Sequence, residues 1–200
     1  MRLLLVGASG TVGQAVANEL APYHELIRAG RHSGDLRVDL TDMASVERMY
    51  EAAGPLDGVI TTAGNVHFGE LAQTTPAQFN LGLQDKLMGQ VNVVLAGIRH
   101  LRDGGSFTLT SGITGAEPIR LGANATTVNA AIEGFVRAAA TELPRGLRIN
   151  VVSATLLTES QDAYGPYFPG FEAVPGARVA LAYRRSVEGV GSGRVYTVWQ

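Results

Sequence analysis

The sequence predicts an α/β protein in which a mostly parallel sheet is covered by helices on both faces. Short apolar runs typical of buried strands alternate with longer stretches whose apolar residues recur at helical spacing. The first apolar run is followed at once by a glycine-rich turn, GASGTVG at 7–13, and then by a helical pattern. Strands that alternate with helices in this way form a parallel sheet whose connections cross over its faces.

The 200 residues fit a single domain over 1–200. A net charge of −2 without a basic block does not favour nucleic acid or an anionic membrane as a partner. The absence of cysteine excludes disulfides and thiolate chemistry, and the four histidines lack metal-ligand spacing, so no metal is expected. No apolar run has the length of a membrane span, and the first strand begins at residue 2. We therefore expect a cytoplasmic protein without a signal peptide.

The first strand, over the apolar run 3–6, leads through the glycine-rich turn into a helix over 14–20. Glycines let the backbone approach a pyrophosphate, and the helix start offers free N–H groups and a positive dipole end. The predicted cofactor-binding residues here are Gly7, Ser9, Gly10, Thr11, Val12 and Gly13. A strand-to-helix turn that needs small residues only for packing is the alternative.

The second strand, over 25–29, ends in GRHSG at 30–34. In a dinucleotide-binding unit the end of this strand meets the adenosine ribose, where an acid selects NAD and a cation accommodates the 2′-phosphate of NADP. Arg31 stands there, followed by His32 and Ser33, so NADP(H) is predicted to be preferred over NAD(H). A solvated loop arginine is the alternative.

The third strand, over 36–38, is followed by Asp39 and Leu40, and a capped helix is predicted over 41–53. An acid after this strand can receive the adenine amino group, so Asp39 and Leu40 are cofactor candidates, with a simple turn as the alternative.

The fourth strand is predicted over 57–64 and ends in small residues, Thr62, Ala63 and Gly64. Small side chains there leave space for a ligand beside the strand ends, where open α/β sheets bind ligands. These three residues complete the predicted cofactor site.

The second half of the chain adds two long helices and three more strands, which makes seven strands. We expect a helix from Pro76 to about 101, ended by Gly104 and Gly105, and a helix over 123–143. The remaining strands are predicted over 106–112, 147–152 and 194–198. The segment 158–176, rich in aromatic residues, proline and glycine, is predicted either to close over a site as a lid or to pack as an ordinary loop.

Five segments in this order resemble the short-chain dehydrogenase/reductase family over nearly the whole chain. They are GASGTVG at 7–13, TAG at 62–64, TSG at 110–112, NAAIEGF at 129–135 and RINVV at 148–152. The resemblance implies a Rossmann fold and reversible hydride transfer between NAD(P)(H) and a carbonyl or alcohol. In the family a serine polarises the carbonyl, a tyrosine is the general acid, a lysine holds the ribose, and an asparagine lies in the preceding long helix.

The resemblance assigns Ser111 to the serine position but puts Ala125 and Asn129 where tyrosine and lysine belong. These two positions are four residues apart and share one helix face, yet neither side chain can do the work of the tyrosine. The family asparagine corresponds to Lys86. We hypothesise that lysine and asparagine have exchanged places and that Lys86 points into the cofactor cleft. The alternative is a solvent-facing lysine. The catalytic candidates are Ser111, Lys86 and Asn129.

The favoured function is that of an NADP(H)-dependent oxidoreductase on a small carbonyl or alcohol. A substitute acid would come from Lys86, His67, Tyr164 or Tyr167. The alternatives are a sensor or partner-binding protein that binds NADP(H) without turnover, and a structural subunit that no longer binds nucleotide.

Self-association is also predicted. Val91, Val93, Val94, Leu95 and Ile98 are more apolar than one buried stripe needs, so we expect a dimer or tetramer formed through the two long helices.

Overall fold

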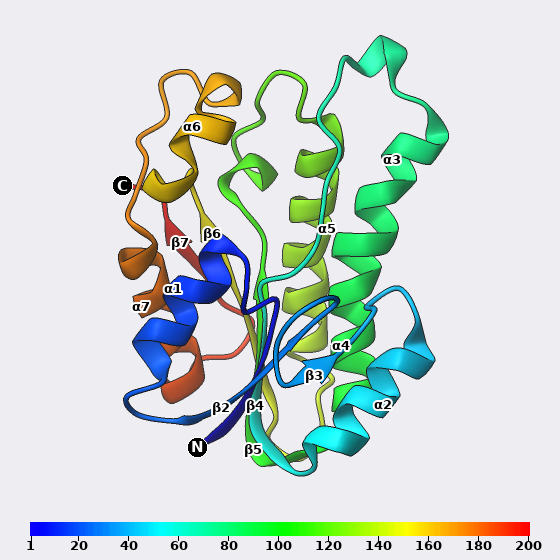
Figure 1. Cartoon of the computed structure of the whole chain (residues 1–200), viewed down its shortest axis with the longest axis vertical. Coiled ribbons are helices and arrows are strands. Elements are labelled where there is room, and N and C mark those ends of the chain that lie inside the picture. The colour runs from blue at the N-terminus through cyan, green and yellow to red at the C-terminus, as the bar shows by residue number, and fades with distance from the viewer.

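The computed structural model describes residues 1–200 as one seven-stranded sheet in which every pair of strands is parallel. The strand order is β3-β2-β1-β4-β5-β6-β7, so the predicted doubly wound architecture is confirmed (Figure 1). The strands are β1 (Arg2–Val6), β2 (Glu25–Gly30), β3 (Leu36–Arg37), β4 (Leu56–Thr61), β5 (Leu101–Thr110), β6 (Arg148–Ala154) and β7 (Val195–Val198).

Helices cover both faces of this sheet. The α-helices are α1 (Thr11–Leu20), α2 (Met43–Ala53), α3 (Pro76–Gly82), α4 (Gly89–Gly97), α5 (Ala123–Ala139), α6 (Gln161–Tyr164) and α7 (Gly176–Glu188). A π-helical stretch, η2 (Leu83–Met88), joins α3 to α4, and η3 (Ile113–Gly115) is one of four short 3₁₀ turns, with η1 (Leu71–Gln73), η4 (Thr158–Ser160) and η5 (Gly165–Tyr167). Helices α1 and α7 pack on one face, and α2, α4 and α5 on the other (Figure 1). None of these helices combines the length and the hydropathy that a membrane-spanning helix requires.

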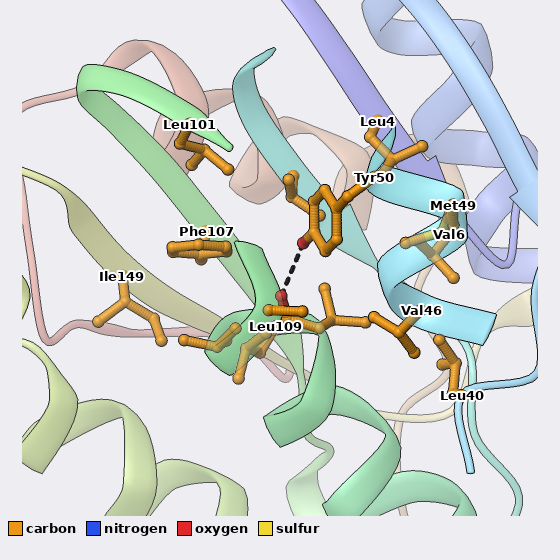
Figure 2. Close-up of a cluster of buried hydrophobic side chains, with 14 of the residues drawn as sticks. Leu4, Val6, Leu40, Val46, Met49, Tyr50, Leu101, Phe107, Leu109 and Ile149 are labelled. Carbon is orange, nitrogen blue, oxygen red and sulfur yellow. Dashed lines mark hydrogen bonds between the residues drawn. The ribbon is translucent and has the colours of Figure 1, made fainter. Parts of the chain in front are cut away.

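The larger core cluster lies between the sheet and α2, α4 and α5. Tyr50 of α2 is fully buried there, and its hydroxyl donates to the Val93 carbonyl of α4 at 2.6 Å (Figure 2). A buried hydroxyl needs such a partner, because an unsatisfied one costs about 1–3 kcal/mol. The bond therefore holds α4 against α2. It also helps to position η2, which directly precedes α4 and contributes to the cavity described below.

Several predicted boundaries are wrong. The helix expected to run from Pro76 to about 101 ends at Gly97, and Gly104 and Gly105 lie inside β5 instead of ending that helix. Gly104 has φ +75°, which a glycine adopts without strain, and the β4–β5 register shifts between Leu56 and Gly58, so the strand continues through an irregular start. The second long helix ends at Ala139, before the expected 143, and β4 ends at Thr61.

Helix α7 is not among the elements expected from the sequence. Its buried residues Val179, Ala180, Tyr183 and Val187 recur at helical spacing, and this signal predicts a helix once the preceding irregular segment is set aside. Of the apolar residues expected to drive self-association, Val93 and Val94 lie in the core and Leu95 is exposed. Association through the long helices stays a prediction.

Candidate active site

The glycine-rich turn forms one wall of a cleft of about 520 Å³ at the carboxyl end of the sheet. Gly7 has φ +85°, and a Cβ there would lie 2.8 Å from the Ala63 nitrogen, so only glycine lets β1 end this close to the segment after β4. A Cβ at Gly13 would overlap the Gly7 carbonyl oxygen. Close packing of backbone atoms therefore determines the shape of the turn. Gly13 is part of this packing but does not line the cleft.

The start of α1 faces this cleft with free donors. The N–H groups of Thr11, Val12 and Gly13 have no backbone acceptor, and no side chain caps the helix at Gly10. Unpaired N–H groups at the positive end of a helix form a site for phosphate oxygens. The residues present thus fit the pyrophosphate of a dinucleotide.

All predicted cofactor-binding residues except Gly13 and Asp39 line the cleft together. They are Gly7, Ser9, Gly10, Thr11, Val12, Arg31, His32, Ser33, Leu40, Thr62, Ala63 and Gly64. Asn65, Asp85 and Tyr164 also line it and were not among the predicted cofactor residues. Asn65 directly follows the motif at 62–64, whereas Asp85 and Tyr164 come from segments far away in the sequence, to which no local motif points.

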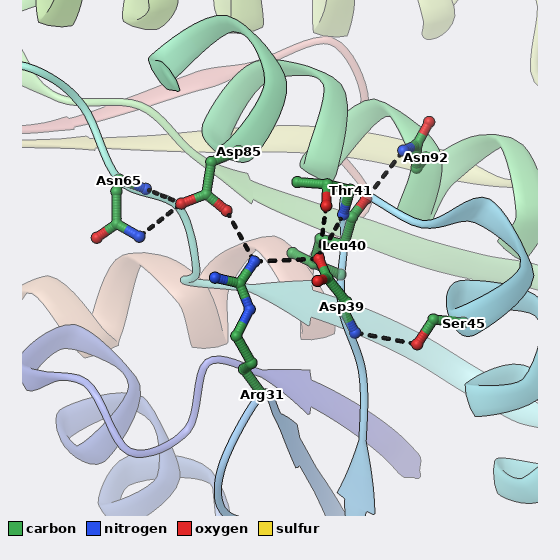
Figure 3. A network of polar contacts seen from close by, with 8 residues as sticks. All are labelled: Arg31, Asp39, Leu40, Thr41, Ser45, Asn65, Asp85 and Asn92. Carbon is green, nitrogen blue, oxygen red and sulfur yellow. Dashed lines mark hydrogen bonds and ion pairs between the residues drawn. The ribbon is translucent and has the colours of Figure 1, made fainter. Parts of the chain in front are cut away.

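Arg31 lies between two carboxylates at the edge of this cleft (Figure 3). Its guanidinium is 3.0 Å from Asp39 Oδ1 and 3.5 Å from Asp85 Oδ1, and its side chain is about half exposed. Hydrogen bonds from Thr41, together with Arg31, hold the pKa of Asp39 below its usual range. Asp85 in turn accepts from the backbone and side-chain nitrogens of Asn65 at 3.1 and 2.5 Å. The predicted phosphate-binding arginine is thus already paired, and Asp39 points to Arg31 and Thr41.

A second, smaller cavity of about 290 Å³ adjoins the cleft and shares Gly64, Asn65 and Tyr164 with it. All three catalytic candidates, Lys86, Ser111 and Asn129, line this cavity, as does Ala125. Its remaining walls come from the loop after β4, from η3 and the residue before it, from the end of β6 and the segment after it, from η4, and from the residue after η5. They are Val66, Phe68, Gly112, Ile113, Thr114, Ala154, Thr155, Leu156, Leu157, Ser160 and Phe168.

Lys86 is the only lysine in the chain and lies in the π-helical stretch between α3 and α4. Its Nζ donates to Asn129 Oδ1 at 2.8 Å and lies 3.5 Å from the Ser111 carbonyl oxygen. A Cβ at Gly64 would lie within 2.7 Å of the Lys86 Cα, so this glycine lets the loop after β4 cover the lysine. Burial lowers the pKa of Lys86 to about 8. Lys86 thus points into the cavity that adjoins the cleft, and not into the cleft itself, as hypothesised, or into solvent.

Asn129 and Ser111 face different partners. The Asn129 amide accepts from Lys86 and donates from Nδ2 to Thr114 Oγ1 at 2.8 Å. Ser111 Oγ donates to Glu133 Oε1 at 2.9 Å, and Glu133 lies one helical turn after Asn129 on α5. Thr114 and Glu133 were not predicted, because their contribution depends on how η3 packs against α5.

The other candidate acids, His67, Tyr164 and Tyr167, differ in whether they reach the cleft and the cavity. Tyr164 lines both the cleft and the cavity, whereas His67 and Tyr167 line neither. The His67 ring is close to Gly69, and its backbone N–H donates to Asn124. Tyr167 packs against Phe68 with ring centroids 5.0 Å apart. The segment 158–176 contains short helical turns, and Ser160, Tyr164 and Phe168 form part of the cavity wall.

The chain matches one family model and is similar to solved structures over nearly its whole length. The family model described as enoyl-(acyl carrier protein) reductase matches residues 8–196. The crystal structure of the protein lin1944 from Listeria innocua is 47% identical, with a TM-score of 0.98 over 100% of both chains. A small-chain dehydrogenase in complex with NADPH is 25% identical, with a TM-score of 0.89 over 99% of this chain and 96% of the other.

Several of the curated relatives are named as reductases. The versicolorin reductase of Emericella nidulans is 32% identical over 114 residues, which are 54% of this chain and 43% of that protein. The tetrahydroxynaphthalene reductase of Pyricularia oryzae is 29% identical over 147 residues, which are 68% of this chain and 52% of that protein. The chain spans about half the length of these curated relatives.

Proposed function

This chain belongs to the short-chain dehydrogenase/reductase family of oxidoreductases, and we propose that it interconverts a carbonyl and an alcohol with NADP(H), using Lys86 as the proton donor. One observation supports this proposal most strongly. The chain's single lysine lies in the cavity beside the cofactor cleft, is held by Asn129, and has a pKa lowered by burial to about 8. A general acid works best when its pKa lies near the working pH.

The cofactor half of the proposal rests on the cleft. Its glycine turn and free helix N–H groups fit a pyrophosphate, and a related dehydrogenase has been solved with NADPH. Preference for NADP(H) is proposed from Arg31, because a guanidinium suits a phosphate. The arginine would have to exchange at least one of its two carboxylate partners for the 2′-phosphate.

When bound, the nicotinamide supplies or accepts the hydride. The side chains in the cavity handle the proton. In the reductive direction Lys86 Nζ donates a proton to the carbonyl oxygen as negative charge develops there. Asn129 Oδ1 accepts from the same ammonium and so orients it. Positioned proton transfer of this kind contributes roughly 10²–10⁴-fold to rate.

The cavity suggests the class of substrate. At about 290 Å³ it suits a small molecule, and Phe68, Tyr164 and Phe168 supply aromatic walls. Several relatives are named as reductases of hydroxynaphthalenes. We therefore propose a small aromatic or otherwise planar carbonyl compound as the substrate.

The alternative is a protein that binds NADP(H) without turnover. Ala125 favours it, because this residue lines the cavity and offers no proton at the position where the resemblance expects a tyrosine. The two functions differ in whether the bound cofactor is consumed.

Two measurements test the proposal. Fluorescence titration with NADPH and, separately, NADH is expected to show tighter binding of NADPH. Reduction of a carbonyl panel is then followed by NADPH consumption in the wild type, in Lys86→Met and in Lys86→Arg. Both variants are expected to lose roughly 10²-fold or more in kcat, because neither side chain releases a proton near neutral pH. Arg120→Ala, an exposed arginine paired with Glu70, is the matched control.

Each result has a distinct meaning. Tight NADPH binding without turnover on the panel would favour the non-catalytic alternative. Wild-type kcat and an unchanged pH profile in Lys86→Met would contradict the role of Lys86. Because Lys86 is the only lysine, its side-chain amine is identified without ambiguity after labelling with acetic anhydride, and the pH dependence of that labelling measures its pKa directly.

A further inference from the structure

The hydroxyl of Ser111 already makes a hydrogen bond within the protein. Its Oγ lies 2.9 Å from Glu133 Oε1, and an ionised carboxylate only accepts hydrogen bonds, so Ser111 donates its single proton to Glu133. The part of Ser111 that faces Lys86 is its carbonyl oxygen. In this arrangement Ser111 has no proton left to offer the carbonyl oxygen of a substrate.

Thr114 has the opposite arrangement in the same cavity. It lies in η3, three residues after Ser111, is 3% exposed, and lines the cavity wall. Its Oγ1 accepts from Asn129 Nδ2 at 2.8 Å and makes no other hydrogen bond within the protein. An amide nitrogen only donates, so the proton of the Thr114 hydroxyl remains available to a ligand.

The orientation of the Asn129 amide is fixed by Lys86. An ammonium only donates, so the amide atom 2.8 Å from Lys86 Nζ is the oxygen, and the nitrogen faces Thr114. The three groups form a chain in which Lys86 donates to Asn129 and Asn129 donates to Thr114. Hydrogen bonds in series polarise one another, which makes the last hydroxyl a better donor.

Gly112 leaves room for this chain of hydrogen bonds. A Cβ at that position would lie 3.1 Å from Asn129 Nδ2, so a side chain there would crowd the amide group that donates to Thr114. The glycine leaves Thr114 as the acceptor from Asn129 and leaves space in the cavity beside it.

From this geometry we propose that Thr114, and not Ser111, donates the hydrogen bond that polarises the carbonyl oxygen of the substrate, as the end of the chain Lys86–Asn129–Thr114. The inference rests on the proposed function, since it assumes a carbonyl ligand in this cavity. It assigns a catalytic role to a residue that the motif around 110–112 does not include.

The test compares Thr114→Val, Thr114→Ser and Ser111→Ala in the full chain, with phenanthrenequinone as the carbonyl probe. Binding of the probe to the complex with NADP⁺ is measured by calorimetry, where no reduction occurs, and its reduction is measured with NADPH. Thr114→Val, which keeps the shape and removes the hydroxyl, is expected to weaken probe binding about 10-fold and to lower kcat about 10²-fold. Thr114→Ser is expected to retain most of both.

The loss in Thr114→Val is expected to exceed the loss in Ser111→Ala at least 10-fold. Thr126→Val, at a half-buried threonine on α5 whose hydroxyl is buried outside the cavity, controls for the substitution itself. Equal losses in Thr114→Val and Thr114→Ser, or a larger loss in Ser111→Ala, would overturn the inference, as would a wild type that does not bind the probe. If the wild type binds the probe but does not reduce it, the proposed turnover fails while the binding arm still tests Thr114.

Discussion

The cleft beside the glycine turn and the cavity around Lys86 share a wall but are built in different ways. The cleft is shaped mainly by backbone, through the close approach of Gly7 to Ala63 and the unpaired N–H groups at the start of α1. The cavity depends on side chains from separate elements, with Lys86 on η2, Thr114 on η3 and Asn129 on α5.

Because of this difference, the two regions are expected to tolerate different kinds of substitution. A backbone site depends on having little or no side chain at a few positions, so a single added methyl group can close it. A side-chain network depends on complete pairing, so removing one member leaves buried donors or acceptors unsatisfied. The three predictions below test this contrast, starting with the largest expected effect.

Gly13→Ala is expected to have the largest effect. Its Cβ would overlap the Gly7 carbonyl oxygen and come within 2.8 Å of the Ala8 Cα, which are backbone atoms that cannot move aside cheaply. We expect a loss of roughly 3–4 kcal/mol in unfolding free energy by urea denaturation. Gly134→Ala, in the interior of α5 with no atom within 4 Å of the new Cβ, is the matched control and is expected to gain about 0.5–1 kcal/mol. Equal stability in the two variants would show that the turn is not closed by packing.

Lys86 is expected to make stability depend on pH in the alkaline range. Its pKa in the folded protein is about 8, below the ordinary value of 10.5, so between these values the unfolded chain binds more protons than the folded one. Wild-type stability, measured relative to Lys86→Met, is therefore expected to rise by about 2 kcal/mol between pH 8 and 10.5 and to be flat below pH 7. Urea unfolding of both proteins across this range measures the difference. A constant difference would mean that the ammonium is not desolvated.

Arg31 is expected to have the smallest effect, confined to one cofactor. Arg31→Ala should weaken NADPH binding about 10-fold and leave NADH binding within about 2-fold, because only NADPH has the 2′-phosphate. Asp85→Asn, which removes one carboxylate beside the guanidinium, is expected to tighten NADPH binding. Fluorescence titration distinguishes the two. A parallel loss for both cofactors in Arg31→Ala would assign the arginine to the structure of the loop rather than to the phosphate.

The sequence by itself predicted the order of strands and helices and most of the cleft. These features depend on local patterns, such as the apolar run 3–6, the glycines at 7–13 and the small residues at 62–64, and each acts within a few residues of itself. Helix α7 could also have been predicted in this way, since its buried face repeats at helical spacing.

Only the tertiary structure decided how the polar side chains pair. Arg31 meets Asp85 across 54 positions, Lys86 meets Asn129 across 43, and the Ser111 hydroxyl donates to Glu133. The direction of each side chain depends on the π-helical stretch around Lys86 and on the packing of η3 against α5, which no local pattern encodes. The motif around 110–112 therefore identifies the strand end that lines the cavity. It does not identify the hydroxyl whose proton is free, because Ser111 donates its proton to Glu133 whereas Thr114 only accepts from Asn129.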